Sequence, residues 1–263
     1  MALLRLNTTT EPHGHSGAIE ELSLIVPDIL SEALRSASRC KSPDNLSWVY
    51  LIEFDQVHFA PEAFDAIGIR RPASVASSVR KRQAEFLFGR LAARLALLDL
   101  SLQAVDIPIG PSREPLWPNG IIGSISHNSR YAAATALRRD LQQGVGIDIE
   151  RVIDAKTHEA LLAIAVDADE QAILKSHACS QWSADTLLTA AFSAKESLFK
   201  GAFKAVGHYF DFSAVRVVGW DRERAMLRLV MVETLCDQLP QARVCEISVF
   251  RLNCETILTH FRW

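Results

Sequence analysis

The sequence lacks any hydrophobic run that approaches the roughly 20 residues needed to span a bilayer. It also lacks low-complexity segments, a flexible linker and a close internal repeat. Its first residues do not contain the long apolar core of a secretory signal. We therefore expect a cytoplasmic globular protein that does not associate with a membrane.

Cysteine is scarce, and no two cysteines are spaced as Cys-x-x-Cys. The five are Cys40, Cys179, Cys236, Cys245 and Cys254. An odd number without paired spacing favours reduced thiols over disulfides or a zinc site. Each is expected to be a small, buried apolar residue.

Acidic side chains are almost absent from one segment. Between Arg70 and Arg94 there are seven basic residues and a single acid, Glu85, although the whole chain has a net charge of −3. A local basic segment on an acidic protein suits a small anionic ligand or an acidic partner, whereas nucleic-acid binding needs a more basic domain. With 263 residues, 49% of them hydrophobic, the chain can bury a large core.

The periodicity of apolar residues predicts both helices and strands. Helices are expected over 77–100, 154–165, 167–177 and 184–206, with shorter ones over 28–38 and 59–67. Strands are expected over 47–54, 121–126, 131–137, 144–151, 214–218, 226–232, 244–251 and 255–261, the last two as a hairpin. Prolines and glycines predict a loop over 107–120. Residues 1–20 show no clear period and are expected to be a weakly ordered tail.

Two stretches carry the chemistry. In residues 144–151 (GVGIDIER), Asp148 and Glu150 alternate with isoleucines, so both carboxylates face one side of a strand. In residues 192–200 (FSAKESLFK), Glu196 and Lys200 lie one helical turn apart and share a face. Three carboxylates and a lysine could hold Mg²⁺ together with phosphate oxygens.

Each pattern has a simpler interpretation. An Asp-x-Glu strand is often a solvated face, and a Glu–Lys pair four residues apart is often a surface ion pair worth about 0.3–0.5 kcal/mol. The basic residues of the helix over 77–100 could likewise form a solvated face, and a lone loop histidine such as His127 is more often structural. The joint occurrence of these patterns favours a metal and phosphate site.

Several motifs resemble those of 4′-phosphopantetheinyl transferases. Residues 144–150 and 192–200 are similar to the two signature motifs of that family. Three further stretches resemble the enterobactin-synthetase component D type, within the surfactin-type class: residues 81–90 (KRQAEFLFGR), 113–118 (REPLWP) and 123–127 (GSISH). Residues 207–212 (GHYFDF) are also similar. The matches occur in the family's order.

The resemblance implies a reaction and roles for individual residues. The 4′-phosphopantetheine arm of coenzyme A is transferred to a serine of an acyl or peptidyl carrier protein, which leaves adenosine 3′,5′-bisphosphate. Asp148, Glu150 and Glu196 would hold Mg²⁺, with Mn²⁺ as an alternative. Glu196 would also activate the serine, and Lys200 would contact phosphate. The residues implied near the 3′-phosphate are Arg82, Arg90, Arg113 and His127, with Ser126 orienting the loop.

The implied fold is α+β, a pseudo-dimer in one chain with the active site at the interface of two similar halves. Each half, residues 21–140 and 141–263, would be a small antiparallel sheet packed with helices. We expect a monomer that serves siderophore, non-ribosomal peptide, polyketide or fatty-acid synthesis. Two alternatives stay open: a catalytically inactive relative that only binds coenzyme A or a carrier, and a metal-dependent phosphohydrolase.

Overall fold

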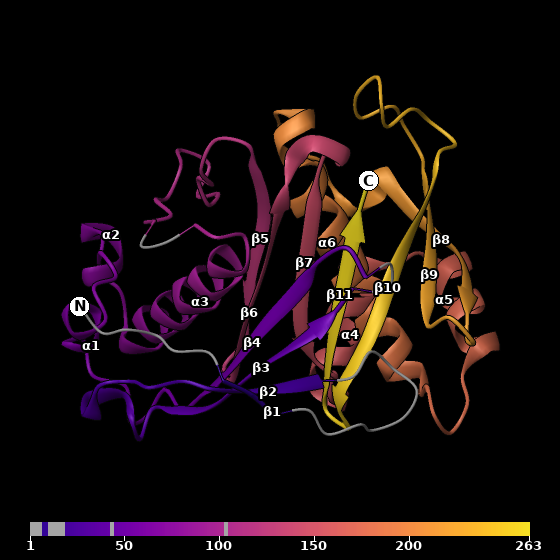
Figure 1. The fold of residues 1–263 in the computed structure, drawn as a ribbon. Coiled ribbons are helices and arrows are strands. Elements are labelled where there is room, and N and C mark those ends of the chain that lie inside the picture. Colours follow the sequence, from indigo (N-terminus) through magenta and orange to yellow (C-terminus); the bar gives the residue numbers. More distant parts are fainter. Residues whose placement is uncertain (1–6, 10–18, 43–44, 103–104) are drawn as a thin grey trace. The chain divides into compact units, whose positions relative to one another are not determined.

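The computed structural model describes residues 7–9, 19–42, 45–102 and 105–263. The chain divides into two compact units, Met1–Asp140 (unit 1) and Leu141–Trp263 (unit 2) (Figure 1). Each unit contains one antiparallel sheet. Within the described ranges, no helix is both long enough and apolar enough to cross a membrane.

Unit 1 contains a six-stranded sheet in the order β1-β2-β3-β4-β6-β5. Its strands are β1 (Asn7–Thr9), β2 (Ile19–Ser23), β3 (Leu34–Lys41), β4 (Trp48–Phe54), β5 (Ile121–His127) and β6 (Tyr131–Arg138). Its helices are α1 (Ala63–Ala66), α2 (Ala73–Ala76) and α3 (Arg80–Asp99). A 3₁₀ turn covers Asp28–Leu30, and another, Arg139–Leu141, ends the unit.

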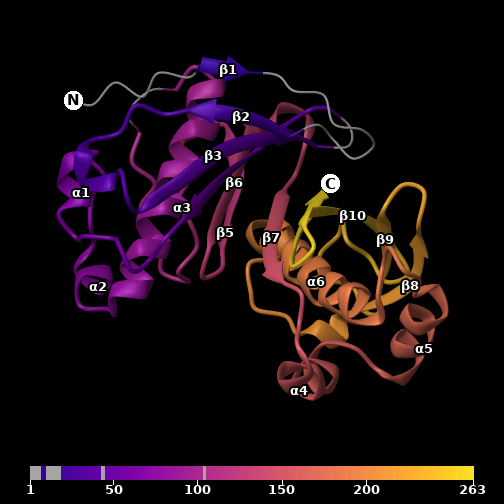
Figure 2. The same cartoon turned by 90° about the horizontal axis from the view of Figure 1, so that it is seen from below.

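The long helix α3 forms the core of unit 1 with the sheet, because its apolar side chains pack on β4, β5 and β6 (Figure 2). Phe88 of α3 stacks on Phe54 of β4 with ring centroids 4.7 Å apart. Helix propensity from its leucines and alanines and this apolar face together explain why the segment is helical. The basic residues of α3 thereby come to lie on a rigid element.

Unit 2 contains a five-stranded sheet in the order β7-β11-β10-β9-β8. Its strands are β7 (Val145–Arg151), β8 (Val215–Asp221), β9 (Met226–Met231), β10 (Val244–Asn253) and β11 (Thr256–Arg262). Its helices are α4 (Ala155–Ala165), α5 (Ala168–His177) and α6 (Ala184–Val206), with a 3₁₀ turn at Phe212–Ala214. The helix α6 runs along the sheet and packs on β7 and β11 (Figures 1 and 2).

Local sequence explains where α6 begins and ends. The Ser183 side chain accepts a hydrogen bond from the backbone N–H of Thr186, as an N-cap residue does. At the other end, Gly207 adopts φ +76°, the left-handed conformation that glycine takes without a steric penalty. These signals fix α6 as a helix of 23 residues, and it carries half of the predicted catalytic site.

The predicted fold class is confirmed: an α+β chain with two similar halves, each an antiparallel sheet packed with helices. The α6 helix and the final hairpin occur as predicted. The helix expected over 28–38 is wrong, because residues 34–41 form β3 and pair with β2 and β4. That pairing overrides weak local propensity. Of the expected tail, residues 7–9 and 19–20 lie in β1 and β2, and the rest lies outside the described residues.

Candidate functional site

The strand β7 presents its even-numbered residues to α6. Gly146 and Asp148 both contact that helix, and Glu150 follows on the same face because side chains alternate along a strand. Asp148 is only 3% exposed, and Glu150 is half-buried. Opposite Asp148, on the neighbouring strand β11, stands Thr259. The predicted strand with two carboxylates on one face is therefore present.

Glycines allow α6 to lie directly on the backbone of β7. A Cβ atom added to Gly146 would lie 1.8 Å from the carbonyl oxygen of Ser197, and one added to Gly144 would lie 1.9 Å from that of Gly201. Real Cβ atoms do not approach that closely, so any side chain at these positions would push the helix away. The glycines of the first motif thus bring Asp148 within reach of side chains on α6.

Two side chains of α6 contact the carboxylate of Asp148. Lys200 Nζ lies 2.6 Å from Asp148 Oδ1 and forms an ion pair with it. Ser193 donates a hydrogen bond of 2.8 Å to Asp148 Oδ2. The Lys200 side chain is 27% exposed, so its ammonium is partly open to solvent while the aspartate is not. Both carboxylate oxygens of Asp148 therefore have partners on the helix that carries Glu196.

The two glutamates lie close enough to this pair for their charges to interact with it. Burial raises the pKa of Glu150 to about 8, the negative charges of Asp148 and Glu196 add to the rise, and Lys200 opposes it. Burial also raises the pKa of Glu196, with Lys200 opposing and Asp148 adding to the shift. The structure thus places three carboxylates and one ammonium group in a single electrostatic cluster.

This cluster is not a preassembled metal cage. Across the described ranges of the chain, no group of three or more His, Cys, Asp or Glu side chains is arranged to hold a metal ion. The chemistry of the donors nonetheless fits Mg²⁺, which prefers carboxylate oxygens and usually completes its shell with water and substrate phosphate. A cation would also offset the burial and the carboxylate repulsion that raise the pKa of Glu150 and Glu196.

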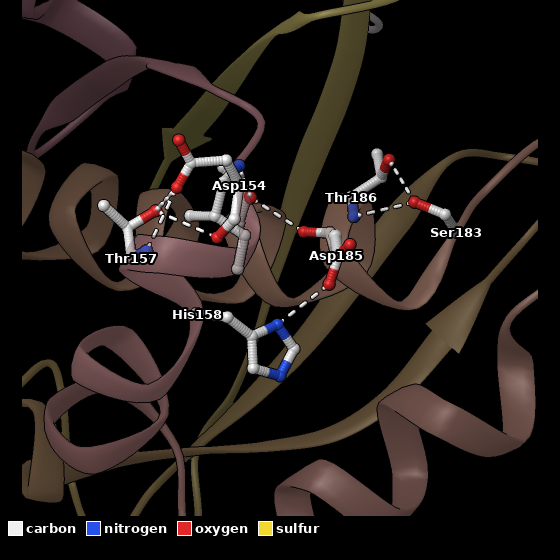
Figure 3. A network of polar contacts seen from close by, with 8 residues as sticks. Asp154, Thr157, His158, Ser183, Asp185 and Thr186 are labelled. Carbon is white, nitrogen blue, oxygen red and sulfur yellow. Dashed lines mark hydrogen bonds and ion pairs between the residues drawn. The ribbon is translucent and has the colours of Figure 1, made fainter.

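The segment after β7 is tied to the first half of α6. His158 Nδ1 lies 2.9 Å from Asp185 Oδ1, and Asp154 accepts hydrogen bonds from the side chain and backbone of Thr157 (Figure 3). The backbone N–H of Ile153 donates to Thr189 Oγ1, which in turn donates to the carbonyl of Asp185. These contacts fix the C-terminal end of β7, just beyond Glu150, against the helix that bears Glu196.

In unit 1, Arg82 and His127 form a second polar group. Arg82 Nη1 lies 2.6 Å from His127 Nε2, and Glu85 Oε2 lies 3.5 Å from both Arg82 Nη1 and His127 Nδ1. Because arginine only donates, Nε2 accepts, and the proton of a neutral ring is on Nδ1 and faces Glu85. Ser126, the preceding residue of β5, is buried and points to the opposite face of the strand.

A cavity of about 410 Å³ lies in unit 1 beside α3. Arg90 and Arg94 line it from the helix, together with Arg70, Phe86 and Asp106. Arg90 donates to the carbonyl of Ile107 and lies over the Phe86 ring, 4.5 Å from its centroid. Burial and the charge of Arg82 lower the pKa of Arg90 to about 10, so the guanidinium stays charged at neutral pH. The cavity is basic and partly aromatic.

Comparison with known proteins gives the family. A model described as "4'-phosphopantetheinyl transferase N-terminal domain" matches residues 70–137, and one described as "4'-phosphopantetheinyl transferase superfamily" matches residues 144–248. "Enterobactin synthase component D" of Escherichia coli O157:H7 is 32% identical over 180 residues, 68% of this chain and 81% of that protein. The chain belongs to the 4′-phosphopantetheinyl transferase superfamily.

Other members of the superfamily are matched over less of their length. "Enterobactin synthase component D" of Salmonella typhi is 40% identical over 152 residues, which cover 58% of this chain and 61% of that protein. "4'-phosphopantetheinyl transferase PptT" of Mycobacterium tuberculosis is 34% identical over 144 residues, 54% of this chain and 61% of that protein. The chain thus spans about three-fifths of the length of these two proteins.

The predicted site residues fall into two groups, one in each unit. Asp148, Glu150, Glu196 and Lys200 cluster in unit 2, and Arg82, Arg90 and His127 lie on α3 and β5 of unit 1. Arg113, in contrast, is exposed in the loop after residue 107, adopts φ +69° and does not line the cavity beside Arg90.

Sequence reasoning missed several residues of the site. Arg70, Arg94 and Phe86 line the cavity together with Arg90. Arg70 and Arg94 belong to the basic segment of the sequence, but no site role was predicted for them. Ser193 was missed because a serine inside a helix carries no local signal. One pattern could have indicated it, since the small residues Ser193, Ser197 and Gly201 recur every four positions and mark the side of α6 that approaches another backbone.

Proposed function

We propose that the protein transfers the 4′-phosphopantetheine arm of coenzyme A to a serine hydroxyl of an acyl or peptidyl carrier protein. The observation that carries this proposal is the cluster of Asp148, Glu150, Glu196 and Lys200 on β7 and α6. Hard oxygen donors beside an ammonium group suit a pyrophosphate that is cleaved with the help of a divalent cation. Membership of the transferase superfamily supports the same reaction.

In this reaction the serine oxygen bonds to the β-phosphorus of coenzyme A, and the bond from that phosphorus to the bridging oxygen breaks. Adenosine 3′,5′-bisphosphate leaves with that oxygen. Glu196 takes the serine proton, directly or through water, and its raised pKa makes it a better base near neutral pH. Lys200 exchanges part of its contact with Asp148 for phosphate oxygen and offsets the charge on the leaving group.

We assign Asp148, Glu150 and Glu196 as the ligands of the divalent cation, Mg²⁺ or alternatively Mn²⁺. When bound, the cation would neutralise pyrophosphate charge and so favour attack by the serine oxygen. Asp148 already lies in a fixed position, because Lys200 and Ser193 hold both of its oxygens.

We propose that the nucleotide end of coenzyme A is bound in unit 1. Arginine forks suit phosphate, so Arg82 and Arg90 are assigned to the 3′-phosphate together with His127. The basic cavity beside Arg90 supports this assignment and adds Arg94. Arg113 is kept as a weaker candidate, and Ser126 is assigned to orient the end of β5.

The biological partner is a carrier protein, and relatives named enterobactin synthase component D favour a carrier of siderophore synthesis. We propose that the enzyme acts as a monomer in the cytoplasm, away from membranes and nucleic acid. Free thiols at all five cysteines agree with a reducing compartment.

Intact-mass spectrometry of an apo carrier tests the proposal. The protein is incubated with coenzyme A and Mg²⁺, with a panel of apo acyl and peptidyl carriers, and parallel mixtures omit the metal or the carrier. We expect at least one carrier to gain the mass of phosphopantetheine, only when metal is present. No gain with any carrier, under Mg²⁺ or Mn²⁺, would contradict the proposal.

The same mixtures separate the two alternative functions. A phosphohydrolase would release phosphopantetheine to water in the mixture without carrier. A catalytically inactive binding protein would bind coenzyme A in calorimetry yet modify no carrier. The complete set of Asp148, Glu150, Glu196 and Lys200 argues against an inactive protein.

A further inference from the structure

Behind Asp148 lies a chain of three hydroxyl groups that the proposed chemistry does not use. Ser193 and Ser197 of α6 and Thr259 of β11 are all 0% exposed. Ser193 Oγ lies 2.8 Å from Thr259 Oγ1, and Ser197 Oγ lies 2.6 Å from the same atom. Ser193 also contacts Asp148 Oδ2 at 2.8 Å. The chain therefore leads from the interior of unit 2 to the carboxylate.

These hydroxyl groups also use backbone carbonyls. A carboxylate paired with Lys200 only accepts hydrogen bonds, so the single proton of Ser193 goes to Asp148. Thr259 donates to the carbonyl of Ser193, 2.9 Å away, and its Oγ1 lies 2.8 Å from Ser193 Oγ. Ser197 Oγ lies 2.6 Å from Thr259 Oγ1 and 3.2 Å from the carbonyl oxygen of Thr259. Thr259 therefore holds both the backbone and the side chain of Ser193, whose hydroxyl orients Asp148.

The three groups meet because of the backbone geometry already described. Thr259 pairs directly with Asp148 across β7 and β11. Ser193 and Ser197 lie one turn apart on the side of α6 that approaches β7. The helix lies so close to Gly146 there that a side chain at position 146 would not fit. Thr259 also lies beyond residue 248, where the match to the superfamily model ends. Its role therefore follows from contacts in this structure.

We propose that Ser193, Thr259 and Ser197 are positioning residues that hold the Asp148 carboxylate in one orientation for metal binding. The inference rests on the proposed function, because it takes Asp148 as a metal ligand. Partners that orient a ligand are known to change metal affinity by about 10–100-fold when they are removed. Here the orienting groups are neutral hydroxyls, so they fix Asp148 without adding or removing charge at the site.

A purely structural role makes a different prediction. If the hydroxyls only join α6 to β11, their removal lowers stability and leaves the metal affinity of the folded protein unchanged. Thr259 offers a matched pair of variants that separates these roles. Thr259→Val keeps the volume and removes the hydroxyl, whereas Thr259→Ser keeps the hydroxyl and removes a methyl group. Thr135→Val serves as a control, since Thr135 is a fully buried hydroxyl on β6 of unit 1 that donates to the carbonyl of Trp48.

The test is a titration with Mn²⁺ in the presence of coenzyme A, in which free Mn²⁺ is measured by electron paramagnetic resonance. Binding to coenzyme A alone is measured separately and subtracted. We expect Thr259→Val and Ser193→Ala to weaken Mn²⁺ binding by about 10–100-fold. Thr259→Ser and Thr135→Val should bind Mn²⁺ like the wild type. Thermal denaturation confirms that each variant is folded at the temperature of the titration.

Two outcomes would overturn the inference: wild-type affinity in Thr259→Val, or no Mn²⁺ binding by the wild type itself. Carrier modification is measured separately on the same samples. If the affinities change as expected while the wild type modifies no carrier, the positioning role stands and the proposed transferase function fails.

Discussion

At the scale of single residues, the charge of Lys200 opposes the burial that raises the pKa of both Glu150 and Glu196. It also forms the 2.6 Å ion pair with Asp148. The four residues thus carry three potential negative charges against one positive charge. A buried site with that imbalance is poor at holding all its carboxylates ionised, and it gains from a divalent cation.

This imbalance predicts how the stability of the metal-free protein depends on pH. The pKa of Glu150 is raised to about 8, so the folded state keeps a proton that the unfolded state has already lost. Stability is therefore full below the unfolded pKa of about 4.5 and falls as pH rises toward 8, by at most about 1.4 kcal/mol per pH unit. Urea unfolding in chelator between pH 5 and 9 measures this slope.

Glu150→Gln removes the titrating group and should flatten that pH dependence. Glu223→Gln is the matched control, since Glu223 is exposed on the turn between β8 and β9. An unchanged slope in Glu150→Gln would show that Glu150 is not the group responsible. Added Mg²⁺ should stabilise the wild type more at pH 8 than at pH 6, because metal binding must displace the proton.

At the scale of elements, the site depends on direct contact between the backbones of α6 and β7. Gly146→Ala places a methyl group against the carbonyl of Ser197 and forces the helix to move. We expect a loss of at least about 3 kcal/mol in unfolding free energy, the upper part of the usual range for overpacking. Chemical denaturation measures the loss.

The control for that substitution is Gly219→Ala in β8. The three atoms nearest to an added Cβ there all belong to the flexible guanidinium of Arg228, the closest at 3.2 Å. That variant should lose about 1 kcal/mol, the low end of the range for overpacking, because the arginine side chain can move aside. Equal losses in the two variants would mean that close approach of the two backbones is not what Gly146 provides.

A buried ion pair joins α6 to the opposite side of unit 2. Lys195 Nζ lies 2.7 Å from Glu170 Oε1, and the two side chains are 2% and 3% exposed. Glu170 also accepts hydrogen bonds from the backbone N–H groups of Asp167 and Val217, so the pair links α5, β8 and α6. Lys195 directly precedes Glu196 in α6, so the ion pair helps to fix the rotation of the helix about its axis.

Lys195→Met should cost about 3–5 kcal/mol, because it leaves the charge of Glu170 buried without its partner. The double variant Lys195→Met, Glu170→Gln should recover part of the loss, since no charge is left buried and the amide oxygen can still accept from one of the two backbone N–H groups. Arg216→Met, which breaks an exposed pair with Asp167, should cost no more than about 1 kcal/mol. A small loss in Lys195→Met, comparable to that control, would refute the structural role of the pair.

These elements show what sequence could and could not predict. The apolar spacing of α6 predicted its bounds, and the alternation in β7 identified Asp148 and Glu150. The helix predicted over 28–38 is wrong, because the pairing of β3 with β2 and β4 leaves no local signal. Thr259 and Glu170 likewise gain their roles from partners 66 and 25 positions away in the chain, Ser193 and Lys195.

At the scale of the whole molecule, the two units divide the proposed tasks. Unit 1 contributes a basic cavity on a rigid helix, and unit 2 contributes the carboxylates and the lysine. The superfamily models match each unit separately, over 70–137 and 144–248. Each predicted set of site residues lies within one of these two units.

The central claim is that Glu196 and its cluster perform phosphopantetheine transfer. Intact-mass spectrometry follows the conversion of an apo carrier by the wild type, by Glu196→Gln and by the control Glu223→Gln, with coenzyme A and saturating Mg²⁺. Circular dichroism first confirms that all three proteins are folded. We predict that Glu196→Gln lowers the rate by at least about 100-fold, as loss of a general base does, and that the control is unaffected. Transfer by Glu196→Gln at close to the wild-type rate would contradict the account.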